Sequence, residues 1–184
     1  MRYIFLFCLV NCSFVWAQSP YEQDCSGNGG FSPVGSIVLT IDTAFNGQTS
    51  YRLNRSVWKV EGGSENNLPK EQIEYSLIVK DTNTNIDSEK RKSTRTTKCE
   101  NIEISKNEYE KLLSLYKASL KVDFFDYAEG LDGSTWCIEI NEGGLQERKL
   151  CFWSPDYKSK ERNLVELVNL GNYLFKFSES KKSK

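Results

Sequence analysis

The segment from Leu131 to Pro155 constrains the fold more than any other part of this 184-residue chain. It contains two β-prone runs, Thr135 to Asn141 and Glu147 to Trp153, and two consecutive glycines lie in the connection between them. Glycine adopts the positive φ angles that a tight connection between antiparallel strands requires. The pattern therefore predicts a β-hairpin.

One register of this hairpin satisfies several requirements together. If Cys137 lies opposite Cys151, the two cysteines can form a disulfide, and Glu139 faces Lys149 as an opposite-charge pair. The same register builds an apolar face, with Trp136 opposite Phe152, Ile138 opposite Leu150 and Ile140 opposite the stem of Arg148. A shift by one residue would turn every side chain to the other face. We therefore expect a disulfide between Cys137 and Cys151.

The first 17 residues are typical of a secretory signal peptide. Arg2 supplies a positive charge, the run from Tyr3 to Phe14 is mostly apolar, and Ala17 offers a small residue at the cleavage site. This run is too short to span a membrane. A lipoprotein anchored through Cys12 is the weaker alternative, because Asn11 replaces the small residue usual at that position. We expect an exported protein, either periplasmic or secreted.

Removal of the signal peptide leaves four cysteines, Cys25, Cys99, Cys137 and Cys151. An even number in an exported chain indicates two structural disulfides. If Cys137 pairs with Cys151, then Cys25 pairs with Cys99. In the alternative connectivities, the hairpin cysteines pair with Cys25 and Cys99 instead.

Hydrophobic patterns place the other elements. Strands are predicted at Val34 to Ile41, Thr49 to Val60 and Gln72 to Lys80, in a meander. A first helix is predicted to begin at a capping box, and its apolar stripe consists of Tyr109, Leu112, Leu113, Tyr116 and Leu120. The capping box of the first helix is formed by Ser105 and Glu108. A second helix is expected from about Ser159 to Phe177.

Together these elements predict an α+β fold. It consists of an antiparallel sheet of about five to seven strands, packed by two amphipathic helices and stapled by two disulfides. Residues 18–178 form a single domain in this prediction, and residues 179–184 form a disordered basic tail.

The segment from Asp81 to Lys98 contains almost no large apolar residue, and its basic residues are Lys90, Arg91, Lys92, Arg95 and Lys98. A solvated loop or a long edge hairpin is the favoured interpretation. The alternative is a loop that binds an anion or a partner.

Composition excludes several classes of function. The chain has no histidine, which removes the commonest general base and metal ligand and excludes Ser-His-Asp, Cys-His and histidine-zinc chemistry. Without Arg2, 23 basic residues stand against 25 acidic ones, a net charge of −2 that argues against nucleic-acid binding. We predict no enzymatic activity, no cofactor, no metal and no stable membrane insertion.

Polar and aromatic residues gather at the open end of the hairpin. We take as candidate partner-binding residues Asp126, Tyr127, Glu129, Asp132, Trp153, Asp156 and Tyr157. Paired carboxylates could instead perform acid–base chemistry or bind a cation, although Asp132 also begins an ordinary turn. Trp153 either anchors a binding surface or packs over the disulfide or under a helix.

The end of the chain resembles a group of small exported bacterial proteins of unassigned activity. The resemblance rests on the pattern LDG-x-x-W-x-x-E from Leu131 to Glu139, on Trp153-Ser154-Pro155, and on the leucine-rich closing helix. Such proteins are similar to periplasmic immunity proteins of contact-dependent or type VI secretion systems. The resemblance implies a protein partner, a cognate toxin, and supplies no catalytic residues.

The leading hypothesis is a periplasmic immunity protein that neutralises a toxic effector by covering its active site. An inhibitor of a lysozyme or protease is a close variant. The alternatives are a small-molecule carrier and a carboxylate-based hydrolase. No pattern in the chain predicts the oligomeric state or the host.

Overall fold

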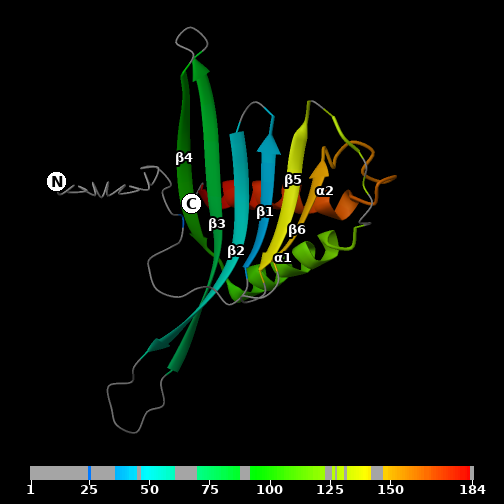
Figure 1. The fold of residues 1–184 in the computed structure, drawn as a ribbon. Helices are drawn as coiled ribbons and strands as arrows, with labels where there is room; N and C mark the ends of the chain where they lie inside the picture. The colour runs from blue at the N-terminus through cyan, green and yellow to red at the C-terminus, as the bar shows by residue number, and fades with distance from the viewer. Residues whose placement is uncertain are drawn as a thin grey trace, which may run out of the picture.

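The computed structural model describes residues 25, 36–44, 47–60, 70–87, 92–122, 126, 128–130, 132–141 and 147–182. These residues form a six-stranded antiparallel sheet with the order β4-β3-β2-β1-β5-β6 and two helices (Figure 1). The strands are β1 Ser36–Thr43, β2 Gly47–Val60, β3 Lys70–Asp87, β4 Lys92–Glu103, β5 Ser134–Asn141 and β6 Glu147–Trp153; the helices are α1 Lys106–Ser119 and α2 Val165–Lys182. The predicted α+β class is confirmed. The predicted signal peptide lies outside the described residues.

Both helices lie against the same face of the sheet (Figure 1). Buried side chains fill the space between the two layers, and within it the Tyr116 hydroxyl donates a hydrogen bond of 2.9 Å to the Tyr51 carbonyl oxygen. The core consists of Leu39, Tyr51, Leu53, Leu77, Val79, Ile104, Leu112, Tyr116, Val122, Ile138, Phe152, Leu164, Leu167, Leu170 and Leu174. Among the described residues, neither helix is long and apolar enough to cross a membrane.

The predicted register of the β5–β6 hairpin is confirmed at every described pair. Cys137 lies opposite Cys151, Trp136 opposite Phe152, and Glu139 opposite Lys149. The Lys149 ammonium lies 3.9 Å from the Glu139 carboxylate. Ile138 and Phe152 point to the helices, while the charged pair points away from them.

The predicted meander is also confirmed, since β1 pairs with β2 and β2 with β3. The basic segment forms the long edge hairpin: β3 continues to Asp87 and β4 begins at Lys92. Lys90 and Arg91 lie outside the described residues.

Helix α1 begins at the predicted capping box. The Ser105 hydroxyl accepts from the Glu108 N–H, and the Glu108 carboxylate accepts from the Ser105 N–H at 2.8 Å. Hydrogen bonds from Lys181 and from the Ser105 backbone lower the pKa of Glu108 to about 2. The Glu108 carboxylate therefore caps α1 and also binds Lys181 of α2.

Helix α2 differs from the prediction at both ends. It begins at Val165 rather than near Ser159, because the residues before it form turns in which Lys158 and Asn163 have positive φ. It also extends to Lys182, so the prediction of a disordered tail is wrong for residues 179–182. The Lys181 ammonium lies 2.8 Å from the carboxylate of Glu108 in α1, and this ion pair holds the last turn of α2 against α1.

Both predicted disulfides are present, and both lie on the sheet face that the helices leave open. The register runs from Cys99 through Lys80, Ser50 and Thr40 to Cys137 and Cys151, so these side chains share one row across the sheet. Cys137–Cys151 joins β5 to β6, and Cys25–Cys99 joins residue 25 to the edge strand β4. Disulfides are compatible with an exported protein.

Gly171 lets α2 approach the sheet closely. A Cβ atom at this position would lie 2.2 Å from Cζ3 of Trp136. The indole cannot swing away freely, because its N–H donates to the Ser134 hydroxyl at 2.8 Å. The glycine therefore costs helix propensity but allows the helix to pack on the Trp136 ring.

We predict that Gly171→Ala destabilises the protein by about 2 kcal/mol, because overpacking outweighs the gain of about 1 kcal/mol in helix propensity. The control is Asn172→Ala, at the next, exposed position of α2, which should change the free energy of unfolding by less than about 0.5 kcal/mol. Urea unfolding measures both changes. An equal or greater stability of Gly171→Ala would contradict this account of the packing.

We predict that replacing Cys137 and Cys151 together by serine lowers the free energy of unfolding by about 3 kcal/mol, the value expected for a loop of about 15 residues. The partners are separated by 14 residues in sequence. Urea unfolding of the double variant tests this, with mass spectrometry confirming that Cys25 and Cys99 remain oxidised. An unchanged unfolding midpoint would contradict the prediction.

Candidate partner-binding site

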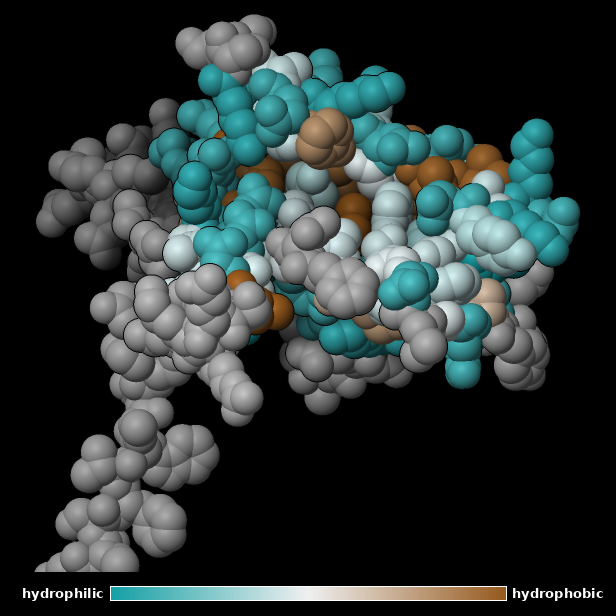
Figure 2. Space-filling view, turned by 90° about the horizontal axis from the view of Figure 1, so that it is seen from above, coloured by the Kyte–Doolittle hydropathy of each residue, from teal (hydrophilic) through white to brown (hydrophobic). Residues whose placement is uncertain are grey.

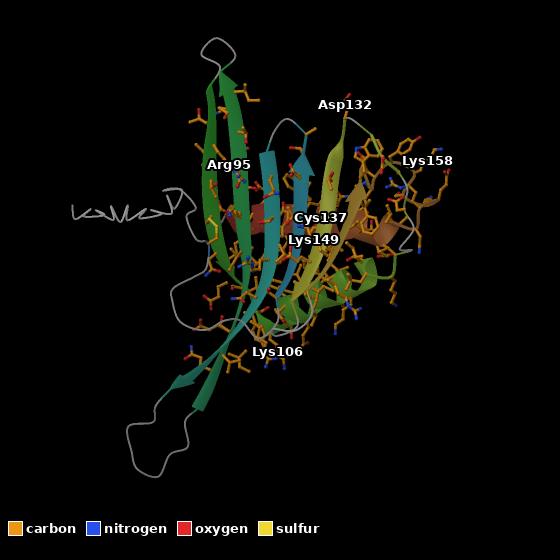
Figure 3. The ribbon with its side chains drawn as sticks, in the orientation of Figure 1. Arg95, Lys106, Asp132, Cys137, Lys149 and Lys158 are labelled. Carbon is orange, nitrogen blue, oxygen red and sulfur yellow. A yellow bond between two sulfur atoms is a disulfide. The ribbon has the colours of Figure 1, made fainter. Side chains whose placement is uncertain are left out.

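The predicted site lies where the chain enters β5 and leaves β6. We call this region the clasped end and define it as residues 126, 128–130, 132–133 and 154–163. In Figure 3, Asp132 and Lys158 mark its two sides, at the end of the sheet and beside it. The region contains turns rather than regular structure, so its conformation depends on specific hydrogen bonds.

Arg162 holds the clasped end together. Its Nε donates to Oδ1 of Asp126 at 2.9 Å and its Nη2 donates to Oδ2, so the ion pair is bidentate. The remaining guanidinium donors bind three backbone carbonyl oxygens, those of Trp153 at 2.7 Å, Ser154 at 2.7 Å and Tyr157 at 2.9 Å. One side chain thus connects the segment before β5 with the turns after β6.

The ion pair is largely shielded from water, since the side chains of Arg162 and Asp126 are both 11% exposed. The hydrogen bonds from Arg162 hold the pKa of the Asp126 carboxyl below its usual range. Asp126 is therefore a stable negative charge at neutral pH. Bidentate pairs of this kind fix geometry as well as charge.

The turns after β6 are strained. Ser154, Lys158 and Asn163 have φ angles of 35°, 50° and 55°, which costs about 1 kcal/mol or more for each residue that is not glycine. The hydrogen bonds of Arg162 to the carbonyl oxygens of Trp153, Ser154 and Tyr157 offset this cost. The Ser154 N–H also donates to the Ser134 carbonyl oxygen at 2.6 Å, tying the turns to β5.

An aromatic pair lies at the surface where the clasped end meets β6: Tyr157 belongs to the clasped end, and Trp153 is the last residue of β6. The ring of Tyr157 packs edge-on against Trp153, with centroids 6.3 Å apart and an angle of 64° between planes. Trp153 is partly buried, and Gly130 lies so close that a Cβ there would be 2.1 Å from the indole. Tyr157 is 54% exposed, with the Lys158 ammonium 5.5 Å from its ring centroid.

The structure separates the predicted site residues into two groups. Glu129, Asp132 and Asp156 are exposed beside the aromatic pair. Asp126 presents no free oxygen, because Arg162 occupies both of its carboxylate oxygens, and we assign it to the scaffold of the site. Tyr127 lies outside the described residues.

Arg162 is the residue that the sequence pattern missed. It falls inside the span predicted as helix, where an arginine is typical of a solvated face, and its partner Asp126 is 36 residues away. Gly130 was also missed. The signal that could have revealed it is its position between the acidic residues Glu129 and Asp132, before a tryptophan-containing strand.

Comparison of the chain with protein-family models, with curated proteins and with solved structures found no match.

We predict that Asp126→Asn lowers the free energy of unfolding by about 3 kcal/mol at pH 7, because Arg162 is left as a shielded charge without a counter-charge. The stabilisation depends on a carboxylate whose pKa is lowered by folding. It is therefore complete above about pH 4 and is lost as the pH falls through the folded-state pKa, so the difference between the two proteins should narrow in acid.

The control for this prediction is Glu139→Gln. Its ion pair with Lys149 spans 3.9 Å between side chains that are 40% and 60% exposed. Exposed pairs of this kind contribute less than about 1 kcal/mol. Urea unfolding at several pH values measures both variants. Equal decreases in the free energy of unfolding at pH 7 would contradict the prediction that the Arg162–Asp126 pair contributes more than an exposed pair.

Proposed function

We propose that this chain is an exported protein-binding module that acts as an immunity protein, neutralising a toxic effector by covering its active site. The observation that carries the proposal is the clasped end. There a largely shielded arginine holds strained turns in place, and these turns carry Tyr157, whose ring packs against Trp153. Three exposed carboxylates, Glu129, Asp132 and Asp156, belong to the same region.

The aromatic pair has the character of a binding hot spot. Tryptophan and tyrosine are enriched among the residues that dominate interface energies, and rigid side chains lose little entropy on binding. Trp153 is already fixed by Gly130 and Tyr157. Tyr157 offers the exposed ring that a partner would cover.

The charges around the pair indicate the kind of partner. Glu129, Asp132 and Asp156 are exposed, as are the basic residues Lys158 and Lys160, and the Lys158 ammonium lies over the Tyr157 ring. A partner surface with basic residues at its rim complements this arrangement and would associate faster at low salt. A toxin that acts on an anionic polymer of the periplasm would have such a basic cleft, because the cleft must attract a negatively charged substrate.

The proposed compartment is the periplasm. The two disulfides are compatible with any oxidising, extracytoplasmic location. The predicted signal peptide and the resemblance to immunity proteins favour the periplasm in particular, because effectors delivered by a competing cell act there.

Co-expression with the product of the neighbouring gene tests the proposal. Cells that export this chain should survive an otherwise lethal periplasmic dose of that product, and the two mature proteins should copurify. Unchanged killing, or the absence of a complex between the purified proteins, would contradict the proposed function.

We predict that Tyr157→Ala weakens the complex with the effector by at least tenfold, about 1.4 kcal/mol or more, because it removes the exposed ring of the hot spot. The matched control is Phe175→Ala on α2, since Phe175 is 60% exposed and Tyr157 is 54% exposed. Titration calorimetry should show less than a twofold change for the control. Equal effects of the two variants would place the contact surface elsewhere.

A further inference from the structure

A polar recess of about 210 Å³ opens on the sheet face that the helices leave uncovered. Its lining residues are Asp42, Gly47, Gln48, Thr82, Thr84 and Arg95. The registers place Asp42 opposite Gln48, Gln48 opposite Thr82, and Thr84 opposite Arg95, so the lining comes from four adjacent strands. Arg95 marks its outer side on β4 in Figure 3.

The recess exists because the strands have unequal lengths. The β1–β2 pair ends at Thr43 and Gly47, whereas the β3–β4 hairpin continues to Asp87 and Lys92 (Figure 1). Gly47 keeps the floor open: its φ is +108°, and a Cβ atom there would lie 2.0 Å from the Thr82 carbonyl oxygen. A residue with a side chain could not occupy this position without moving β3.

The lining offers every type of hydrogen-bonding group. The Asp42 carboxylate only accepts, the Arg95 guanidinium only donates, and Gln48 and Thr84 do both. In the part of the chain that the structure describes, neither Asp42 nor Arg95 belongs to an ion pair. The Thr82 hydroxyl already has a hydrogen-bond partner, since it lies 3.3 Å from the Thr97 hydroxyl.

This combination selects against most ligand classes. Asp42 would repel a simple anion, and Arg95 would repel a simple cation. An apolar molecule would leave all the polar groups of the lining unpaired. An α-amino acid could satisfy the two charges. It would leave the amide of Gln48 and the hydroxyl of Thr84 facing its side chain.

We propose that the recess binds a single neutral sugar unit. Every sugar hydroxyl both donates and accepts, so one ring can satisfy the carboxylate, the guanidinium, the amide and the hydroxyl together. The volume equals about seven water molecules at about 30 Å³ each, and it is below the range of about 300–1,000 Å³ typical of drug-sized ligands. One pyranose ring is a ligand of this size.

The recess adjoins the clasped end but does not depend on it. Asp42 lies opposite Thr135, and the Ala44 N–H donates to the Gly133 carbonyl oxygen at 3.2 Å. Figure 2 shows that this end of the molecule, seen from above, is largely hydrophilic. Sugar binding here therefore stands whether or not the aromatic pair contacts an effector.

NMR titration of the mature chain tests the proposal, with D-glucose, N-acetylglucosamine, its β-1,4-linked trimer and glycine as probes. We expect saturable shifts at the amides of Gln48, Thr84 and Arg95 with at least one saccharide. Tighter binding of the trimer than of the monosaccharide identifies a glycan chain as the source, and equal binding identifies a free or terminal sugar. Saturable binding of glycine alone, or of no probe, overturns the proposal.

Two substitutions locate the site, since Gln48→Ala and Arg95→Ala should each weaken sugar binding by at least tenfold. The matched control is Arg52→Ala, because Arg52 is also exposed on this sheet face but lies opposite Val38 and Ile78, away from the recess. The spectra themselves verify that each variant is folded. A loss of binding in Arg52→Ala equal to that in Arg95→Ala would overturn the assignment.

Discussion

The packing of both helices against a single face of the sheet is the constraint on which the rest of this structure depends. In a strand, successive side chains point to opposite faces, so covering one face forces every second residue into the core. Leu39, Leu53 and Leu77 meet the helices from three adjacent strands. The alternate residues lie on the open face, and they form the disulfides, the charged cross-strand pair and the polar recess. A one-residue slip in any strand would exchange the two sets.

The same alternation explains why the hairpin could be predicted in detail. Its register was overdetermined, because the cysteines, the opposite charges and the apolar pairs of β5 and β6 all required the same alignment. The capping box at Ser105 was predictable for a similar reason, since its signal lies within four residues. Where several local requirements agree, a single sequence is enough.

The conformation of the clasped end could not be predicted, because the contacts that stabilise it join distant parts of the chain. The pairing of Arg162 with Asp126 leaves no trace in hydrophobic periodicity, and the turns it holds have positive φ at residues other than glycine. The periodicity of Leu164, Leu167 and Leu170 is real, but nothing in it shows where the helix begins. The last turn of α2 was predicted wrongly for the same reason. In the sequence Lys181 and Lys182 are typical of a solvated tail, and only the fold brings Glu108 and Glu100 next to them.

The one-sided sheet also accounts for where the candidate sites occur. Strand interiors on the open face are fixed by neighbours on both sides, and the strand ends are free to differ in length and to continue into turns. The recess arises where β3 and β4 outlast β1 and β2, and the aromatic surface arises where β6 leaves the sheet beside Gly130. The bond from the Ala44 N–H to the Gly133 carbonyl oxygen connects the two regions. The row of Cys99, Cys137 and Cys151 crosses the sheet next to both regions, so disulfides hold the two edge strands β4 and β6 close to the candidate sites.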